Sequence, residues 1–333
     1  MKPNEKPIVF AYSGQGSQYY QMGAELLREN PAFRAQLEQA DAAIERSLGY
    51  SLLAIVHGAA KKHEPFDDIR YTSLSVFLVE YALTRWLEGL GIRPSLLFGY
   101  SIGEVCAHVI AGSLSFESAV RLIARQAEAL LRKCPRAFMA AVLGKPAQLE
   151  ALRSPSLHVA CRNSAEHWVV TGALGALAGA KARAESLGLI FSALPVRYGF
   201  HSALVDAIEH DQRLLAAATP LSAPALEVVS CAYGESRGTP NADYFWDVVR
   251  RPIDLRLAAL FVASRHGDVL YVDVGPSGTL STLLKPLLRS LGGSETVAVL
   301  SPMNSDITGI SQLQRRLAGT TPQPIQDGAR RVQ

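Results

Sequence analysis

The sequence is poor in several features that mark special classes of protein. Its 333 residues contain only four cysteines, which lie far apart, and this excludes a disulfide framework and a zinc ribbon. The net charge of +3 is too small to favour a nucleic-acid partner. No apolar run reaches the ~20 residues of a membrane span, and the first residues lack a signal-peptide core. We therefore expect a soluble, cytoplasmic protein with no membrane partner and no nucleic-acid partner.

The residues that are abundant favour a globular α/β protein. Hydrophobic residues make up 48% of the chain and charged residues 19%, which is enough for a sizeable core. Because 333 residues are long for one compact core, we expect a large domain with a smaller insertion, or two domains. Strand-like and helix-like stretches alternate along most of the chain, which predicts a mainly parallel sheet covered on both faces.

The middle of the chain follows a different order. Residues 138–196 predict strand, helix, strand, strand, helix and strand, which is typical of a ferredoxin-like unit. We assign residues 135–197 to a small ferredoxin-like subdomain inserted into a large subdomain of residues 1–134 and 198–319. Residues 320–333 are polar and rich in Pro, Gln and Arg, and we expect them to be disordered.

Apolar residues three and four apart predict the main helices of the large subdomain. Ser115 is typical of a helix cap and predicts a helix that runs to about Lys133. Further predicted helices start near Tyr20 or cover residues 31–61, 71–90, 203–218, 244–249, 255–264 and 280–291.

The clearest motif is Gly99-Tyr100-Ser101-Ile102-Gly103. An apolar strand-like run precedes it, and a helix-like stretch of residues 103–111 follows it. A Gly-x-Ser-x-Gly motif between a strand and a helix is typical of a nucleophile elbow, where a sharp turn exposes the serine hydroxyl beside a helix N-terminus. The same pattern also occurs in ordinary glycine-rich turns. The loop Ser13–Gln18 is similarly ambiguous, since its N–H groups either face an oxyanion or simply join a strand to a helix.

A serine nucleophile needs a general base, because its hydroxyl is weakly nucleophilic. The sequence offers eight histidines. His201 stands out because it follows Gly199-Phe200 at the predicted junction of the subdomains, where clefts form. His108 lies two helical turns from Ser101, too far for contact. Since a lone histidine is commonly structural, the residues alone leave the identity of the base open.

Three segments together resemble the malonyl-CoA:acyl-carrier-protein transacylase family, which includes the acyltransferases of polyketide synthases. They are Tyr12–Gln18, Gly99–Glu104 and Gly199–Ser202, with further matches at Asn163-Ser164, Val170–Gly172 and Val274–Pro276. The motifs occur in family order over residues 7 to about 305. The resemblance implies an α/β-hydrolase-like large subdomain and a ferredoxin-like small subdomain.

The resemblance also implies roles for individual residues. Ser101 would be the nucleophile and His201 the general base, with an acyl-Ser101 ester as the intermediate. Backbone N–H groups of Gln15 and Ile102 would form the oxyanion hole. A backbone carbonyl near Val248 would orient the histidine. Three further residues are implied to contact the substrate: Tyr100, which stands where the family usually has histidine, Phe200 and Asn163.

One departure from the family concerns the acyl group. Malonyl-type members have an arginine twenty-five residues after the serine, which pairs with the malonyl carboxylate, and this sequence has Gln126 there. Arg125 is adjacent, but one residue along a helix turns a side chain by about 100°, away from the pocket. A buried carboxylate without its partner costs roughly 3–5 kcal/mol, which weakens malonyl selection by about 10²-fold or more. The alternatives are that Gln126 merely broadens a transferase or that another arginine substitutes.

The sequence therefore looks most like a branch of the family found in trans-acyltransferase polyketide pathways, whose stand-alone members hydrolyse acyl groups and lack this arginine. We hypothesise an enzyme that removes stalled acyl groups, such as acetyl, from acyl carrier proteins. The alternatives are a trans-acting acyltransferase that loads malonyl or other acyl units, and a non-enzymatic carrier-protein scaffold. We expect a monomer without a cofactor, because the acyl group arrives on phosphopantetheine or coenzyme A.

Overall fold

Two β-sheets organise the protein, for which the computed structural model describes residues 6–303 and 305–318. The strands of the larger sheet are β1 (Ile8–Tyr12), β2 (Leu96–Gly99), β7 (Glu227–Ser230), β8 (Glu235–Ser236), β10 (Leu270–Asp273) and β11 (Glu295–Ala298). They lie in the order β11-β10-β1-β2-β7-β8, and each neighbouring pair is parallel except β7 and β8. The mainly parallel sheet predicted from the alternating pattern is confirmed.

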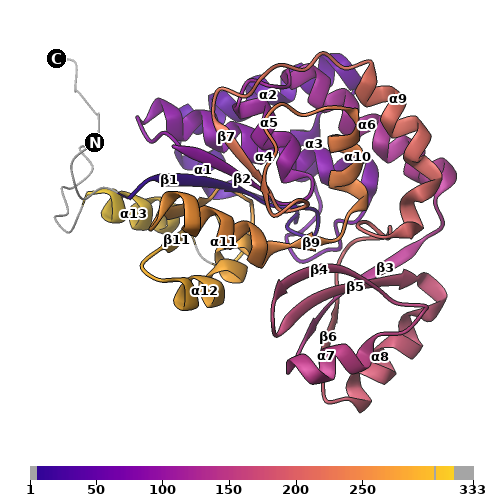
Figure 1. Ribbon diagram of the computed structural model, residues 1–333. Coiled ribbons are helices and arrows are strands. Elements are labelled where there is room, and N and C mark those ends of the chain that lie inside the picture. Colours follow the sequence, from indigo (N-terminus) through magenta and orange to yellow (C-terminus); the bar gives the residue numbers. More distant parts are fainter. Residues whose placement is uncertain (1–5, 304, 319–333) are drawn as a thin grey trace, which may run out of the picture.

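Both faces of the larger sheet are buried, as β1 illustrates. Phe10 and Tyr12 belong to one hydrophobic core, whereas Val9 and Ala11, which point the opposite way, belong to another. The first core takes side chains from α1 (Ala24–Glu29), α2 (Pro31–Leu48), α3 (Leu52–Val56), α4 (Ile69–Gly89), α5 (Gly103–Ile110) and α6 (Phe116–Lys133). The second takes them from α11 (Leu255–His266) and α12 (Thr279–Leu291), which lie across the sheet from α2 and α4 (Figure 1).

The smaller sheet comes from the middle of the chain. Its strands are β3 (Ala137–Leu143), β4 (His158–Ser164), β5 (His167–Ala173) and β6 (Ile190–Ala193), and its helices are α7 (Pro146–Leu152), η1 (Leu174–Ala176, a 3-10 turn) and α8 (Leu177–Ser186). The strand order β6-β3-β5-β4 with antiparallel pairs is the predicted ferredoxin-like arrangement. Phe138 and Trp168 pack against the two helices, while Met139 and Val169 on the opposite face join the second core of the larger sheet.

The two sheets are also joined by a short strand that the sequence did not predict. β9 (Ile253–Asp254) follows α10 (Ala242–Arg250) and pairs in parallel with β4, opposite Cys161 and Arg162. This part of the chain therefore extends the small sheet at the side that faces the large one (Figure 1).

Several predicted helices have different limits in the structure. Helical periodicity over residues 31–61 breaks into α2 and α3, because Gly49 adopts φ 81° and Ser51 caps a new helix. The predicted helix of residues 203–218 begins as the 3-10 turn η2 (Ala203–Ile208) before α9 (Glu209–Ala217). Helix α13 (Asp306–Leu317) was not predicted, and residues 320–333 lie outside the described residues. Among the described helices, none combines the length and the hydropathy needed to cross a bilayer.

Candidate active site

Ser101 sits in the sharp turn between β2 and α5, with a left-handed backbone of φ 57°. Both flanking positions require glycine, because other backbone atoms lie where a side chain would begin. A Cβ atom on Gly103 would lie 2.3 Å from the carbonyl oxygen of Tyr12, and one on Gly99 would lie 2.6 Å from Cα of Glu104. Strand, turn and helix thus have the geometry of a nucleophile elbow.

His201 faces Ser101 from the segment that leaves the small subdomain. Its Nε2 lies 2.9 Å from Ser101 Oγ, and its Nδ1 lies 3.0 Å from the carbonyl oxygen of Arg251. A carbonyl oxygen only accepts hydrogen bonds, so Nδ1 must carry the proton and Nε2 offers its lone pair to the serine hydroxyl. Burial lowers the pKa of His201 to about 4, while the hydrogen bond to Arg251 raises it. The neutral imidazole that a general base requires is therefore the form present near pH 7.

The carbonyl that orients His201 is not the one predicted. The sequence placed it near Val248, but the structure gives this position to Arg251. Val248 lies within α10, where carbonyl groups point along the helix axis, whereas Arg251 is the first residue beyond the helix and has an extended backbone. The side chain of Val248 instead lines the pocket at Ser101.

The two backbone groups predicted for an oxyanion hole lie beside this pair. Gln15 and Ile102 line the same pocket as Ser101, and a Cβ atom on Gly14 would lie 2.9 Å from Cβ of Ser101. Within the described residues, neither the Gln15 nor the Ile102 backbone N–H has a protein acceptor. Two such free donors beside a serine hydroxyl suit the negative charge that develops on a carbonyl oxygen under attack.

The loop that carries Gln15 is anchored by a residue that sequence reasoning missed. Glu80, fully buried on α4, accepts hydrogen bonds from the backbone N–H of Ser13 at 2.6 Å and from its hydroxyl at 2.8 Å. Burial raises the pKa of Glu80 well above its usual value. An acidic residue within the apolar run of residues 74–83 was the available signal, since such a residue needs a buried partner.

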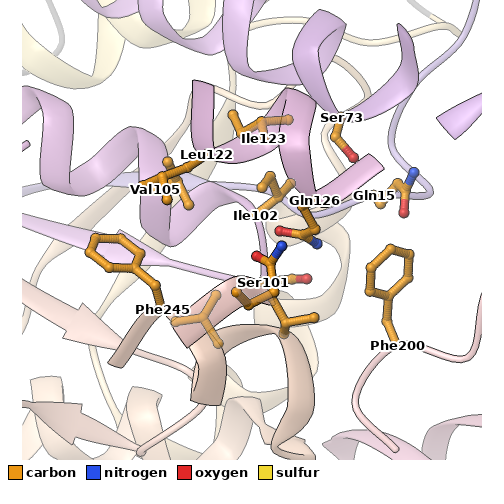
Figure 2. Close-up of a pocket in the computed structure, with 13 residues that line it drawn as sticks. Gln15, Ser73, Ser101, Ile102, Val105, Leu122, Ile123, Gln126, Phe200 and Phe245 are labelled. Carbon is orange, nitrogen blue, oxygen red and sulfur yellow. The ribbon is translucent and has the colours of Figure 1, made fainter. Parts of the chain in front are cut away.

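A narrow pocket opens beside Ser101, as Figure 2 shows. Gln126 points into it from α6, and Phe200 lies at its other side. Arg125 is exposed and points away from the pocket, as the helical geometry predicted, and it pairs with Glu128 at 2.8 Å. The unfilled volume is about 30 Å³, room for roughly one or two water molecules. The other lining residues, mostly apolar, are Ser73, Val105, Leu122, Ile123, Gln212, Phe245, Val248 and Val249.

Tyr100 and Asn163, both predicted to contact the substrate, do not line this pocket. Both are buried, and the Tyr100 hydroxyl donates to Asn163 Oδ1 at 2.9 Å. This bond ties the elbow to β4 of the smaller sheet. Gln212 and Phe245 were missed because they lie on α9 and α10, far from the elbow in sequence.

A second, wider cleft of about 760 Å³ lies on the other side of His201. Arg153, Arg162 and Arg250 line it, together with residues of β4 and β9. Arg250 pairs with Asp206, while the Arg162 guanidinium lies 5.0 Å from the centre of the Trp168 ring. His201 lines this cleft and bonds to Ser101, which lines the narrow pocket; Asp254 also lines the cleft, and Arg153 pairs with Glu150. No group of His, Cys, Asp and Glu side chains suited to a metal ion occurs in the described ranges.

Residues 9–322 match the family model described as the acyl transferase domain. The chain belongs to the acyl transferase domain family. The resemblance found in the sequence is thereby confirmed.

Relatives of this acyl transferase domain occur in polyketide pathways. The chain is 37% identical over 312 residues to the polyketide biosynthesis acyltransferase homolog BaeD of Bacillus velezensis, covering 93% of this chain and 96% of that protein. It resembles the acyltransferase domain from the second module of the salinomycin polyketide synthase, with a TM-score of 0.80 and 30% identity over 92% of this chain and 72% of that one.

A more distant solved structure shares the fold. The malonyl-transacylase PlMCAT, solved with the acyl-carrier protein AntF, matches with a TM-score of 0.78 and 21% identity, covering 94% of this chain and 99% of that one. These likenesses confirm the α/β-hydrolase-like large subdomain with a ferredoxin-like small one.

Proposed function

We propose that this protein is an acyl-transferring enzyme of polyketide biosynthesis that hydrolyses acyl groups from carrier-protein thioesters. One observation carries the proposal: among the described residues that line the pocket at Ser101, none is a cation, and Gln126 stands within it. A malonyl carboxylate buried there would lack a partner, at a cost of roughly 3–5 kcal/mol. A neutral acyl group such as acetyl meets no such penalty, and the pocket of about 30 Å³ suits a short one.

The acylation half-reaction follows from the Ser101–His201 geometry. Ser101 Oγ attacks the thioester carbonyl carbon, and its proton passes to His201 Nε2. The carbonyl oxygen becomes an oxyanion that the N–H groups of Gln15 and Ile102 stabilise. The carbon–sulfur bond then breaks, and the protonated histidine returns its proton to the departing thiolate. The products are acyl-Ser101 and a free carrier-protein thiol.

The deacylation half-reaction requires a water molecule at the ester. His201, neutral again, takes a proton from this water as its oxygen attacks the acyl carbon of Ser101. Collapse of the second oxyanion breaks the ester bond, returns the proton to Ser101 Oγ and releases the carboxylic acid. The amide of Gln126 leaves the pocket uncharged and offers hydrogen bonds that suit a bound water.

The broad cleft beside His201 fits the carrier side of the substrate. Phosphopantetheine is a long chain with a phosphate, and a basic cleft that ends at His201 can hold such a chain with its sulfur at Ser101. Arg162, which pairs with no carboxylate among the described residues, supplies positive charge toward an acidic carrier protein, whereas Arg153 already pairs with Glu150 at 3.2 Å. No cofactor is needed in this scheme, because Ser101 and His201 carry both half-reactions.

The second candidate is a trans-acting acyltransferase that passes the acyl group to another thiol. It is favoured by the match to BaeD, which is named an acyltransferase homolog. The two functions share acyl-Ser101 and differ only in the group that attacks it.

The deciding experiment offers acetyl- and malonyl-loaded carrier protein, and both coenzyme A thioesters, to the protein together with an unloaded acceptor carrier protein. Mass spectrometry follows free acid, transferred acyl group and acyl-Ser101. We expect free acetate to be the main product and expect Ser101→Ala to abolish the acyl-enzyme. Rapid malonyl transfer to the acceptor with negligible free acid would overturn the hydrolase and leave the acyltransferase.

A further inference from the structure

A closed ring of hydrogen bonds links Ser101 to His201 through the body of the protein. The N–H of Glu104 donates to the Ser101 carbonyl at 2.9 Å, and Glu104 Oε1 accepts from the N–H of Ala232 at 3.1 Å. The carbonyl of Ala232 accepts from Arg251 Nε at 3.3 Å. The Arg251 carbonyl lies 3.0 Å from His201 Nδ1, and His201 Nε2 returns to Ser101 Oγ at 2.9 Å.

The second carboxyl oxygen of Glu104, Oε2, bonds to α10, the helix directly before Arg251. Tyr244, on the first turn of α10, donates its hydroxyl to Glu104 Oε2 at 2.6 Å. The last turns of the same helix reach His201, whose backbone N–H donates to the carbonyl of Val249 at 2.9 Å. The Glu104 carboxyl therefore bonds α10 and the segment after β7 at the same time.

We propose that Glu104 is a positioning residue. It fixes the position of the Arg251 carbonyl, and through that carbonyl the orientation of the His201 imidazole relative to Ser101. The proposal rests on the proposed function for the roles of Ser101 and His201. It adds a residue that touches neither the substrate nor the reacting atoms.

Within this ring of hydrogen bonds, those of Glu104 are the best shielded from water. Glu104 is fully buried and Tyr244 is 4% exposed, so water does not compete for their hydrogen bond. The Arg251 side chain is 50% exposed, and its contact with Asp247 is 3.6 Å long. An exposed ion pair such as Arg251–Asp247 contributes little to fixing the backbone of Arg251. The orientation of the Arg251 carbonyl therefore depends on α10, which the Tyr244–Glu104 bond secures.

Tyr244→Phe tests the proposal, because it removes the hydroxyl that bonds to Glu104 and leaves the aromatic side chain of residue 244 in place. Tyr19→Phe is the matched control: it also removes a tyrosine hydroxyl, which donates to the Pro276 carbonyl at 2.9 Å, outside the ring. The acylation rate of Ser101 is measured with acetyl-loaded carrier protein and with a fluorophosphonate probe. We expect Tyr244→Phe to lower the maximal rate about 10- to 100-fold with KM little changed, and Tyr19→Phe to leave it near the wild-type rate.

A double-mutant cycle separates positioning from general destabilisation. In a His201→Ala background the closed ring of hydrogen bonds is already broken, because its link through the imidazole is missing. Tyr244→Phe should then change the residual acylation rate by less than about two-fold. Glu104→Gln, which keeps one oxygen acceptor, should act in the same direction as Tyr244→Phe. The proposal is overturned if Tyr244→Phe and Tyr19→Phe acylate equally, or if Tyr244→Phe acts undiminished without His201. If wild-type protein fails to form acyl-Ser101, the proposed function fails instead.

Discussion

Ser101 and His201 share an unusual backbone conformation. Their φ angles are 57° and 60°, and Gln21 is the one other non-glycine residue in the described ranges with a positive φ. A left-handed backbone costs an L-residue about 1–2 kcal/mol, so it persists only where neighbouring contacts impose it. At His201 the backbone bond to Val249 imposes it, and at Ser101 the close approach of Gly103 to β1 does. The strain therefore marks both members of the proposed pair.

Gln126 gives the sharpest prediction at the residue scale. Gln126→Arg places a cation in the pocket, where it can pair with a malonyl carboxylate, and we expect the malonyl-to-acetyl ratio of acylation rates to rise about tenfold or more. The neighbouring Arg125→Gln is the control, since Arg125 is exposed and pairs with Glu128. Competition between the two loaded carrier proteins measures the ratio. An unchanged ratio in Gln126→Arg would show that this side chain does not contact the acyl group.

At the scale of elements, the site depends on how closely β1, β2 and α5 approach one another. The N–H of Tyr100 donates to the carbonyl of Tyr12, and the helix that follows Ser101 starts against the same carbonyl. This approach brings the loop after β1, with Gln15, beside the elbow. Two parallel neighbouring strands thus bring the loop that carries Gln15 and the turn that carries Ser101 to the same edge of the sheet.

Gly103→Ala tests this approach directly. Its Cβ would lie 2.3 Å from the Tyr12 carbonyl oxygen, so α5 must move away from β1. We expect the free energy of unfolding to fall by about 1–3 kcal/mol and the acylation rate to fall with it. Gly89→Ala, at the end of α4 with nothing within 4 Å of the added atom, should leave stability unchanged or slightly raised. Urea unfolding compares the two; equal stabilities would contradict the steric requirement.

At the scale of the whole molecule, the large subdomain buries carboxyl groups that have no cationic partner within residues 6–303 and 305–318. Burial raises the pKa of Glu104 and of Asp273 to about 7, and raises the pKa of Glu80 well above its usual value. The folded protein therefore holds protons on these groups at pH values where the unfolded chain has released them. Stability from a raised carboxyl pKa is lost as the pH rises through the folded-state value.

The free energy of unfolding should therefore fall as the pH rises from 6.5 to 8, by on the order of 2 kcal/mol. The buried histidines offset part of this fall near pH 6.5, because burial lowers the pKa of His201 and of His108 to about 4, so both are neutral in the folded protein while the unfolded chain still releases their protons. Urea unfolding at several pH values measures the slope. Glu80→Gln removes one titrating group and should make the fall shallower; a stability that rises with pH would refute the prediction.

The sequence by itself determined the local features of this protein. The strand, the serine flanked by glycines and the helix predicted the elbow, because backbone sterics act over neighbouring residues. The order of strands and helices predicted both sheets, and the 100° step of a helix separated Gln126 from Arg125.

Only the tertiary structure decided which distant groups meet at Ser101. It gave the orienting carbonyl to Arg251 rather than Val248, and it paired Tyr100 with Asn163 instead of turning them to the pocket. It also joined β9 to the small sheet. Each of these contacts depends on where a helix ends or how two sheets pack. Such positions arise from the packing of the whole chain, and no short stretch of residues encodes them.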